Sequence, residues 1–297
     1  MPELPDLAVV ADALHAALSG RPIERAEAPA PLAVRGTPAE LGALIGQGLR
    51  QVRRRGKFIV LELDRDRIAV NAMLTGRFQL AAPGDKLPQS TAVILGFGPR
   101  TAAAKKVARW TKGASWLPGD AAGAELRYRD PSQMGKVYIL PAGVTRAVTA
   151  FEDAEQGPDA DSSELTLEVW RQRIRRNPGE LKSLLRNQGF VAGIGNAYSD
   201  EILHAAKLSP FRRRSSLAPE EIDALYEATR TTLARAIRVL EERVVLEERV
   251  PPTFEKQVRD FLAVHLRGGE ACPRCGTRLS EVSSRSEATT WCRGCQA

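Results

Sequence analysis

The stretch that decides the fold is residues 187–210, NQGFVAGIGNAYSDEILHAAKLSP. Gly193 and Gly195 stand two apart, between an apolar run and a segment whose apolar residues have helical spacing, and glycine permits the tight turn that such a junction needs. Asn196 follows at once and is a good N-cap for a helix over residues 197–206. A glycine turn that leads into a helix N-terminus suits a phosphate. An ordinary helical corner has the same pattern, so this stretch predicts two helices around a turn and leaves the ligand open.

The length and charge of the chain indicate two domains and a polyanionic partner. A chain of 297 residues is long enough for two domains with separate cores. The net charge of +7 is uneven, because residues 1–150 carry 21 Lys and Arg against 13 Asp and Glu, whereas residues 151–297 carry 22 against 23. Excess positive charge favours nucleic acid, although many basic proteins bind none. Basic clusters, each also compatible with a solvated face, lie at residues 53–55, 105–106 and 212–214.

Targeting signals are not evident in the sequence. No run of about 18 apolar residues occurs, so we expect no membrane span and no membrane partner. The opening MPELPDLAVV is acidic where a secretory signal is basic. We therefore expect a cytoplasmic protein.

The first half of the chain predicts a helix followed by an antiparallel β-sandwich. Pro2 and Pro5 bracket the start, and Asp6 can cap a helix that ends at Gly20. Short apolar segments separated by turn residues follow, a pattern typical of an antiparallel sandwich. The predicted strands are residues 57–63, 68–73, 92–96, 125–128 and 136–140.

The second half predicts a linker, a helical domain and a metal-binding tail, which makes the fold class α+β multidomain. Residues 152–163 are acidic and lack bulky apolar side chains, as expected of a linker. Helices are predicted over residues 165–175, 180–186, 197–206 and 219–246. The predicted domains are a β-sandwich (1–150), a linker (151–163), a helical domain (164–256) and a C-terminal hairpin (257–297).

The four cysteines, Cys272, Cys275, Cys292 and Cys295, form two C-x2-C pairs separated by sixteen residues. Four thiolates in two knuckles match one tetrahedral, structural Zn²⁺ and leave no open catalytic position. A redox pair or an iron site is the alternative. The segment between the pairs is long enough for a β-hairpin, which the metal would hold rigid because so short a segment has no core of its own.

Pro2, Glu3 and Lys57 are the candidate catalytic residues. Removal of Met1 would make Pro2 the N-terminal residue, with a secondary amine that titrates at about pH 8. Such an amine can attack an aldehyde-like carbon to give an iminium, an electron sink for elimination, and Glu3 can donate or accept the proton. Lys57 can hold a phosphate as a point charge. Taken singly, each residue is more often without such a role.

Together these features resemble the formamidopyrimidine-DNA glycosylase / endonuclease VIII family over nearly the full length of the chain. Each motif is unspecific by itself, whereas the set in this order and spacing is highly specific. The motifs are Met1-Pro2-Glu3-Leu4-Pro5, Arg54-Arg55-Gly56-Lys57, Leu74-Thr75-Gly76-Arg77-Phe78, Asp130-Pro131, Gly157-Pro158, VAGIGNAYSDE at residues 191–201, and the four-cysteine tail ending in Gln296.

The resemblance implies a β-sandwich, a helix–two-turns–helix domain and a zinc hairpin, with double-stranded DNA as the partner of a monomeric enzyme of the bacterial nucleoid. Such enzymes flip a damaged base out of the duplex. Pro2 would then release the base and cleave the strand by β,δ-elimination, while Glu3 shuttles protons. Lys57 and Asn196 would grip the phosphates beside the lesion, and we include Tyr198 among the DNA contacts.

The chain departs from the family pattern in its phosphate grip and near its N-terminus. Glu287 stands where an arginine is usual, five residues before the third cysteine, and a carboxylate repels phosphate. Arg285, two residues away on the same face of a regular strand, is the expected substitute. Asp6 stands in place of a glutamate and Asn71 in place of a histidine.

The residues that read the opposite base are also altered. After Asp130 and Pro131 the purine branch has an arginine and a phenylalanine, whereas this chain has SQMG. The residues predicted to fill the void left by the flipped base are therefore Leu74, Ser132 and Met134. The base specificity of neither branch of the family carries over to this chain. The target base is left open between an oxidised purine such as 8-oxoguanine, a ring-opened purine and an oxidised pyrimidine. The alternatives are a lyase restricted to abasic or single-stranded DNA, and a non-catalytic DNA-binding protein of the same fold.

Overall fold

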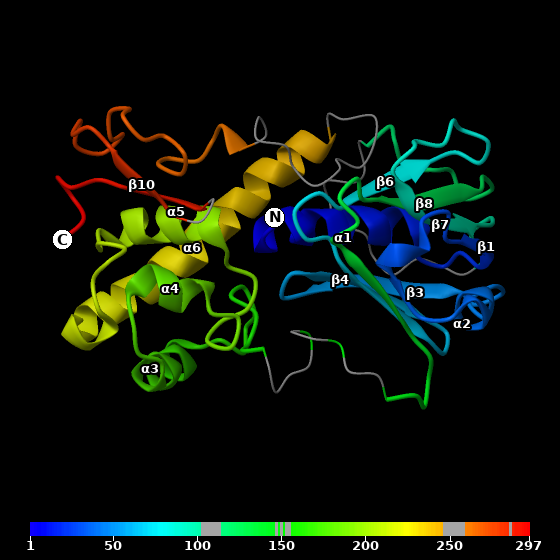
Figure 1. Cartoon of the computed structure of the whole chain (residues 1–297), viewed down its shortest axis with the longest axis horizontal. Coiled ribbons are helices and arrows are strands. Elements are labelled where there is room, and N and C mark those ends of the chain that lie inside the picture. Colours follow the sequence, from blue (N-terminus) through cyan, green and yellow to red (C-terminus); the bar gives the residue numbers. More distant parts are fainter. Residues whose placement is uncertain (102–113, 146–147, 149–150, 152–155, 246–258, 285–286) are drawn as a thin grey trace. The chain divides into compact units, whose positions relative to one another are not determined.

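The computed structural model describes residues 1–101, 114–145, 148, 151, 156–245, 259–284 and 287–297, which divide into two compact units (Figure 1). The first unit consists of Met1–Val148 with Ile237–Glu255, and the second of Thr149–Ala236 with Lys256–Ala297. Among the described residues, none of the helices has the length and apolar character that a membrane crossing requires.

The first unit is the predicted β-sandwich, and its helix α1 (Leu4–Leu18) packs against β3 and β4. One sheet has the order β1-β7-β8-β6 and pairs antiparallel throughout. The other has the order β2-β9-β5-β4-β3, in which β2 pairs parallel with β9 and the remaining pairs are antiparallel. The strands are β1 (Ile23–Glu27), β2 (Val34–Arg35), β3 (Leu49–Arg55), β4 (Phe58–Leu63), β5 (Arg67–Asn71), β6 (Arg77–Ala81), β7 (Thr91–Phe97), β8 (Ala124–Arg129) and β9 (Lys136–Leu140), and the short helices are η1 (Pro31–Ala33) and α2 (Pro38–Gly42).

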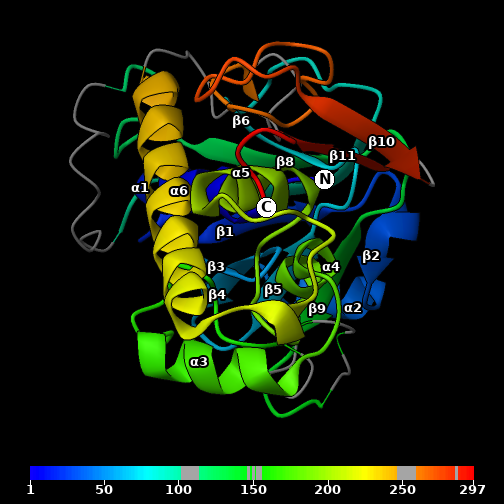
Figure 2. The same ribbon diagram turned by 90° about the vertical axis from the view of Figure 1, so that its left-hand side faces the viewer.

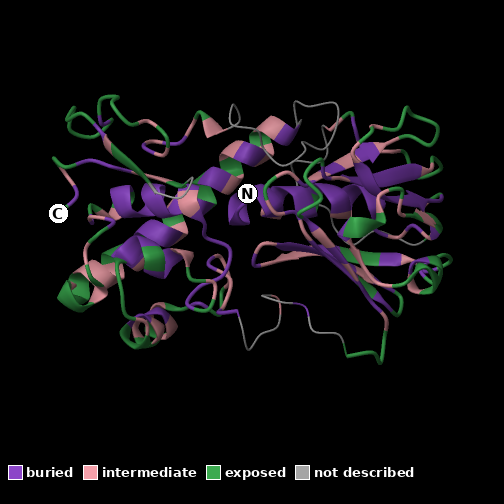
Figure 3. Ribbon diagram, viewed as in Figure 1, coloured by how far each residue is buried: buried purple, intermediate pink, exposed green. Residues whose placement is uncertain are grey.

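The core of the first unit lies between the two sheets. Leu61 and Val70 of one sheet and Val93 and Leu126 of the other line the same small apolar cavity of about 20 Å³. β4 is buried along almost its whole length (Figure 3), because one face points to this core and α1 covers part of the other. A strand covered on both faces reads as a continuous apolar run, which is why the sequence FIVLEL predicts it well.

The second unit holds the predicted helices and the hairpin. The helix α5 packs against both α4 and β11 and is buried over most of its length (Figures 2 and 3). Its interior position buries charged side chains together with apolar ones, among them Asp200 and Glu201. The elements are α3 (Leu167–Arg176), α4 (Leu181–Arg186), α5 (Asn196–Ala206), η3 (Arg214–Ser216), β10 (Ser280–Ser284), β11 (Glu287–Trp291) and the first part of α6 (Pro219–Val245), whose residues from Ile237 onward belong to the first unit.

The loop between α4 and α5 forms the predicted glycine turn. Gly193 has a φ of 101°, a conformation that glycine adopts without strain. The side chain of Gln188 holds the turn from inside, because its Oε1 accepts from the Gly193 N–H at 2.9 Å and its Nε2 donates to the Ile194 carbonyl at 2.9 Å. The loop also pairs with residues 156–163, the described part of the predicted linker, through an Ala160 N–H donated to the Ala192 carbonyl. That part of the chain therefore belongs to the second unit.

Candidate nucleic-acid interface and metal centre

The N-terminus of α1 holds the two residues predicted to carry the chemistry. Glu3 is the N-cap of α1 and forms a capping box with Asp6, whose Oδ2 accepts the Glu3 backbone N–H at 2.8 Å. Pro2, Glu3 and Asp6 are all buried. The prediction that Asp6 caps the helix was wrong: the helix begins earlier, at Leu4, because Glu3 takes the cap and Asp6 binds it from the third helical position.

Lys57 lies at the tip of a two-residue hairpin turn rather than at the start of a strand. Arg55 pairs with Phe58, so Gly56 and Lys57 form the turn between β3 and β4. Gly56 has a φ of 56°, the positive value that tight hairpin turns require. Asn71, at the end of the neighbouring strand, pairs with Phe58, and its Oδ1 accepts the Met73 N–H at 3.1 Å. The turn therefore presents Lys57, which is half-buried, at a defined end of the sheet.

Two loops of the first unit carry the predicted void-filling residues. Leu74 is 54% exposed and Met134 is 44% exposed, although both are large and apolar. Asp130, which is buried, ties the loops together: its Oδ1 accepts the Thr75 hydroxyl at 2.5 Å and its Oδ2 accepts the Gly135 N–H at 2.6 Å. Ser132 is part of the same network, since its hydroxyl donates to Asp130 Oδ1 at 3.1 Å. The two loops therefore expose the apolar side chains of Leu74 and Met134, and the hydrogen bonds of Asp130 hold the loops together.

In the second unit, Asn196 is the first residue of α5 and Gly195 is the N-cap, so the prediction of an Asn196 cap was wrong. The Asn196 side chain turns to the hairpin, where its Nδ2 donates to the Ala288 carbonyl at 2.9 Å. Its Oδ1 is buried and makes no hydrogen bond to the described residues. Tyr198 is fully buried, with the Arg259 guanidinium 5.8 Å from its ring centroid.

A buried group of charged side chains holds the hairpin against α4 and α5. Lys182 of α4 donates to Asp200 Oδ1 at 2.7 Å, to the Ala288 carbonyl at 3.0 Å and to Thr289 Oγ1 at 2.9 Å. His265 Nδ1 lies 2.8 Å from the other Asp200 oxygen. Burial lowers the pKa of Lys182, and the neighbouring Asp200 carboxylate opposes this shift. All three donors of the lysine are used, so this cluster is structural.

The second strand of the hairpin, β11, begins with Glu287, which forms an ion pair with α4. Arg186 Nη2 lies 2.5 Å from Glu287 Oε1, and the two side chains are 33% and 50% exposed. The carboxylate that replaces the family's arginine is thus neutralised by an arginine from another element. Arg285 and the basic cluster at residues 105–106 lie outside the described residues.

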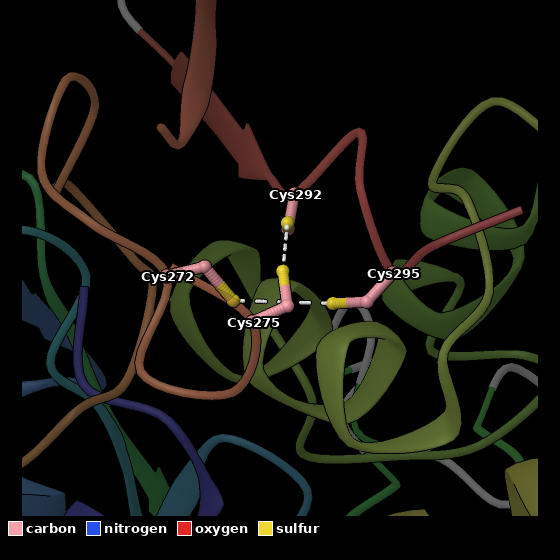
Figure 4. A group of neighbouring side chains, drawn as sticks. All are labelled: Cys272, Cys275, Cys292 and Cys295. Atoms are coloured by element: carbon pink, nitrogen blue, oxygen red, sulfur yellow. Dashed lines mark hydrogen bonds between the residues drawn. The ribbon is translucent and has the colours of Figure 1, made fainter. Parts of the chain in front are cut away.

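The four cysteines meet at one point, as Figure 4 shows. All four sulfur atoms lie within 4.8 Å of one another, with 3.4 Å between those of Cys275 and Cys292 and 3.9 Å between those of Cys272 and Cys295. A tetrahedral metal with metal–sulfur bonds of about 2.3 Å separates its ligands by about 3.8 Å. The cluster therefore fits one metal ion with four thiolate ligands.

Two buried polar side chains fasten the metal-binding tail to α5 and its C-terminal loop. Gln296 accepts the Cys292 N–H at 2.7 Å and donates to the Leu208 carbonyl at 2.9 Å. Glu201 of α5 accepts the N–H groups of Ala263, Val264 and His265 at 2.7–2.9 Å. Burial raises the pKa of Glu201, and these three hydrogen bonds oppose the shift. The tail is thereby fixed on the helix that follows the glycine turn.

The structure groups the predicted residues unit by unit. It places Pro2 next to Glu3 in the first unit, and Asn196 against the hairpin in the second. Sequence reasoning missed Lys182, Asp200 and Arg186. Lys182 carried a signal, because a lysine within the apolar run of α4 is unusual unless it has a buried partner.

Comparison with known families gives the class of the protein. Residues 1–137 match the family described as the formamidopyrimidine-DNA glycosylase N-terminal domain, and residues 156–246 match the formamidopyrimidine-DNA glycosylase H2TH domain. The formamidopyrimidine-DNA glycosylase of Pelotomaculum thermopropionicum is 28% identical over 100% of this chain and 99% of its own length. That of Symbiobacterium thermophilum is 29% identical over 100% of this chain and 89% of its own.

Solved structures agree in fold. The Lactococcus lactis Fpg in complex with DNA containing an abasic site has a TM-score of 0.80 at 24% identity and covers 99% of both chains. MutM in complex with DNA containing carbocyclic 8-oxo-G has a TM-score of 0.79 at 23% identity and covers 100% of both. The chain belongs to the formamidopyrimidine-DNA glycosylase family, the base-excision-repair glycosylases that also cleave abasic sites.

Proposed function

We propose that this enzyme removes a damaged base from double-stranded DNA with Pro2 as the nucleophile and Glu3 as the proton carrier. After removal of Met1, the Pro2 nitrogen is a secondary amine. The observation that carries the proposal is the capping box, which holds Glu3 rigidly as the next residue. A carboxylate has two oxygens, so helix capping by one is compatible with proton transfer by the other.

The proposed reaction has two stages. In the first, the Pro2 nitrogen attacks the anomeric carbon, the glycosidic bond breaks, and the base leaves with a proton. Opening of the sugar ring then gives an iminium between Pro2 and the sugar, which is the electron sink for the next steps. In the second stage, loss of a proton from the sugar expels the 3′ phosphate, and a further elimination expels the 5′ phosphate. Glu3 carries these protons.

The remaining predicted residues have proposed binding roles. Lys57, at the hairpin tip, and Asn196, at the start of α5, bind phosphates beside the lesion. Leu74 and Met134 fill the void left by the flipped base, which their exposure on two braced loops supports. The proposed DNA contacts of Tyr198 and Arg285 rest on the sequence, and the burial of Tyr198 places its side chain away from solvent.

We further propose that the metal is zinc. Four thiolates at tetrahedral separation are the ligand set of structural zinc sites. When bound, the ion holds the hairpin in place and takes no part in the reaction, because four protein ligands leave no open position. A cytoplasmic location on the bacterial nucleoid and a monomeric state complete the proposal. The bacterial origin of the relatives supports this location.

Borohydride trapping on a duplex with one abasic site tests the catalytic proposal. We expect a covalent adduct that maps to Pro2 in the wild type and is absent from Pro2→Gly. We also expect Glu3→Gln to lose base excision while it still binds this DNA. A wild type that has lost Met1, binds the duplex and yields no adduct would contradict the proposal.

A lyase restricted to abasic or single-stranded DNA is the second candidate. It is favoured by the Ser132 hydroxyl, whose hydrogen bond to Asp130 engages it within its own loop network. A panel of duplexes separates the two candidates. Excision of any damaged base supports the glycosylase, whereas cleavage confined to abasic sites supports the restricted lyase.

A further inference from the structure

The contact between Arg186 and Glu287 differs from other ion pairs of the second unit. Arg186 offers one nitrogen to one carboxylate oxygen, and its guanidinium makes no other hydrogen bond to the described residues. Arg171, by contrast, engages both oxygens of Asp223. The guanidinium of Arg186 is therefore fixed by one N–H group, and its other N–H groups make no hydrogen bond within the described part of the chain.

Arg212, another arginine of this unit, is an example of a guanidinium whose nitrogen atoms all donate hydrogen bonds. Arg212 donates to both oxygens of Glu221 at 2.6 and 2.8 Å, and also to the hydroxyl and carbonyl oxygens of Ser216. An arginine in that state has little capacity left for another anion. Arg186, which is 33% exposed, keeps the fork geometry that matches phosphate.

The neighbours of Arg186 explain why it is the cation beside the hairpin that is available to a ligand. Lys182, one turn earlier on α4, is buried and directs all its donors to Asp200 and the hairpin. The Asn196 amide also points to the hairpin, at Ala288. Three donor side chains therefore converge on residues 287–289, and Arg186 is the cation among them that reaches solvent.

We propose that Arg186 is a DNA-phosphate contact of the second unit and that Glu287 is its positioning residue. This inference rests on the proposed function, since it assumes DNA as the ligand. The carboxylate fixes the direction of the guanidinium through one N–H and leaves the others for a backbone phosphate. The cation that the hairpin lacks at position 287 is thus supplied by α4.

The test is the salt dependence of binding to a duplex with a tetrahydrofuran abasic analogue, which cannot form the iminium. A residue that neutralises one phosphate contributes about 0.9 to the slope of log affinity against log salt. We expect Arg186→Ala to make this slope shallower by about that amount and to weaken binding about tenfold at moderate salt. Arg171→Ala is the matched control, a comparably exposed and ion-paired arginine, and should change neither quantity.

Two further variants separate binding from folding. Glu287→Gln should tighten binding, because the amide oxygen can still accept the Arg186 N–H while the charge that repels phosphate is removed. Arg186→Glu combined with Glu287→Arg preserves the ion pair and places the cation on the hairpin, so it should recover most of the affinity and slope that Arg186→Ala loses. Metal content and unfolding temperature of each variant show whether the hairpin is intact.

The proposal is overturned if Arg186→Ala, with its metal bound, keeps the wild-type slope, or if the exchanged pair binds as weakly as Arg186→Ala. Borohydride trapping on a natural abasic site is run in parallel with the same preparations. If the wild type forms no adduct at Pro2, the catalytic proposal is contradicted. The salt dependence of binding to the tetrahydrofuran duplex would still decide the role of Arg186.

Discussion

The Nζ of Lys182 lies 2.7 Å from Oδ1 of Asp200, with both side chains buried between α4, α5 and the hairpin. The pair is surrounded by partners that complete it, since the lysine also binds the hairpin backbone and the aspartate also contacts His265. A buried charge is tolerated in a protein when its partner and hydrogen bonds are all present. This pair therefore makes the position of the hairpin dependent on the two helices around the glycine turn.

Lys182→Met should destabilise the second unit by about 3–5 kcal/mol, because it leaves the Asp200 carboxylate buried beside one partner fewer. The measurement is urea unfolding followed by fluorescence. Arg171→Ala, which breaks an exposed ion pair, is the control and should change the free energy of unfolding by less than about 1 kcal/mol. An equal loss of unfolding free energy in the two variants would show that Asp200 does not need Lys182 as a partner in the folded protein.

Cys292→Ser should reduce the metal content from one ion per chain to none and weaken DNA binding, because the metal is expected to hold the hairpin rigid. Elemental analysis and a binding assay measure the two effects. Val282→Ser, on the same hairpin but outside the cluster and 46% exposed, should retain the metal. Full DNA affinity in metal-free Cys292→Ser would remove the hairpin from the DNA interface.

Leu74→Ala and Met134→Ala should each slow the excision of a damaged base at least about tenfold and change cleavage at a preformed abasic site much less. The reason is that stabilisation of the void matters when a stacked base must leave the duplex, a step that costs a few kcal/mol. Leu87→Ala is the control, since Leu87 is a similarly exposed apolar residue of the same unit, at 42%. A comparable loss in Leu87→Ala would mean that surface hydrophobicity, not void filling, is measured.

Asp6→Ala should slow trapping at an abasic site about tenfold to hundredfold, because it releases the Glu3 backbone and lets the reacting groups move. Asp6→Glu should recover part of the rate. Glu40→Ala removes the same kind of residue from the capping box of α2 and serves as the control. Each of the two alanine variants should lose about 1 kcal/mol of stability, so a rate effect shared by both would assign Asp6 a merely structural role.

Sequence reasoning worked where local chemistry decides the structure. The strands β4, β5, β7, β8 and β9 and the helices of the second unit were predicted from apolar spacing, and the four cysteines from their own pattern. The strands β1, β2, β3 and β6 were not predicted. It failed at the two helix caps. Asp6 and Asn196 are both good N-caps by residue type. The N-cap is an earlier residue in each helix, Glu3 for α1 and Gly195 for α5. Helix boundaries are weakly encoded because adjacent residues can exchange the role.

The sequence by itself determined the class of this protein, because the family motifs, the metal ligands and the Pro2-Glu3 start are all short-range patterns. The tertiary structure alone decided the pairing of Arg186 with Glu287 and of Lys182 with Asp200. Arg186 and Glu287 are 101 residues apart, and no local rule relates two charges at that separation. Their contact depends on how α4 and the hairpin pack against α5. Glu287, which in the sequence is the loss of a cation, is therefore in the folded chain the ion-pair partner of Arg186.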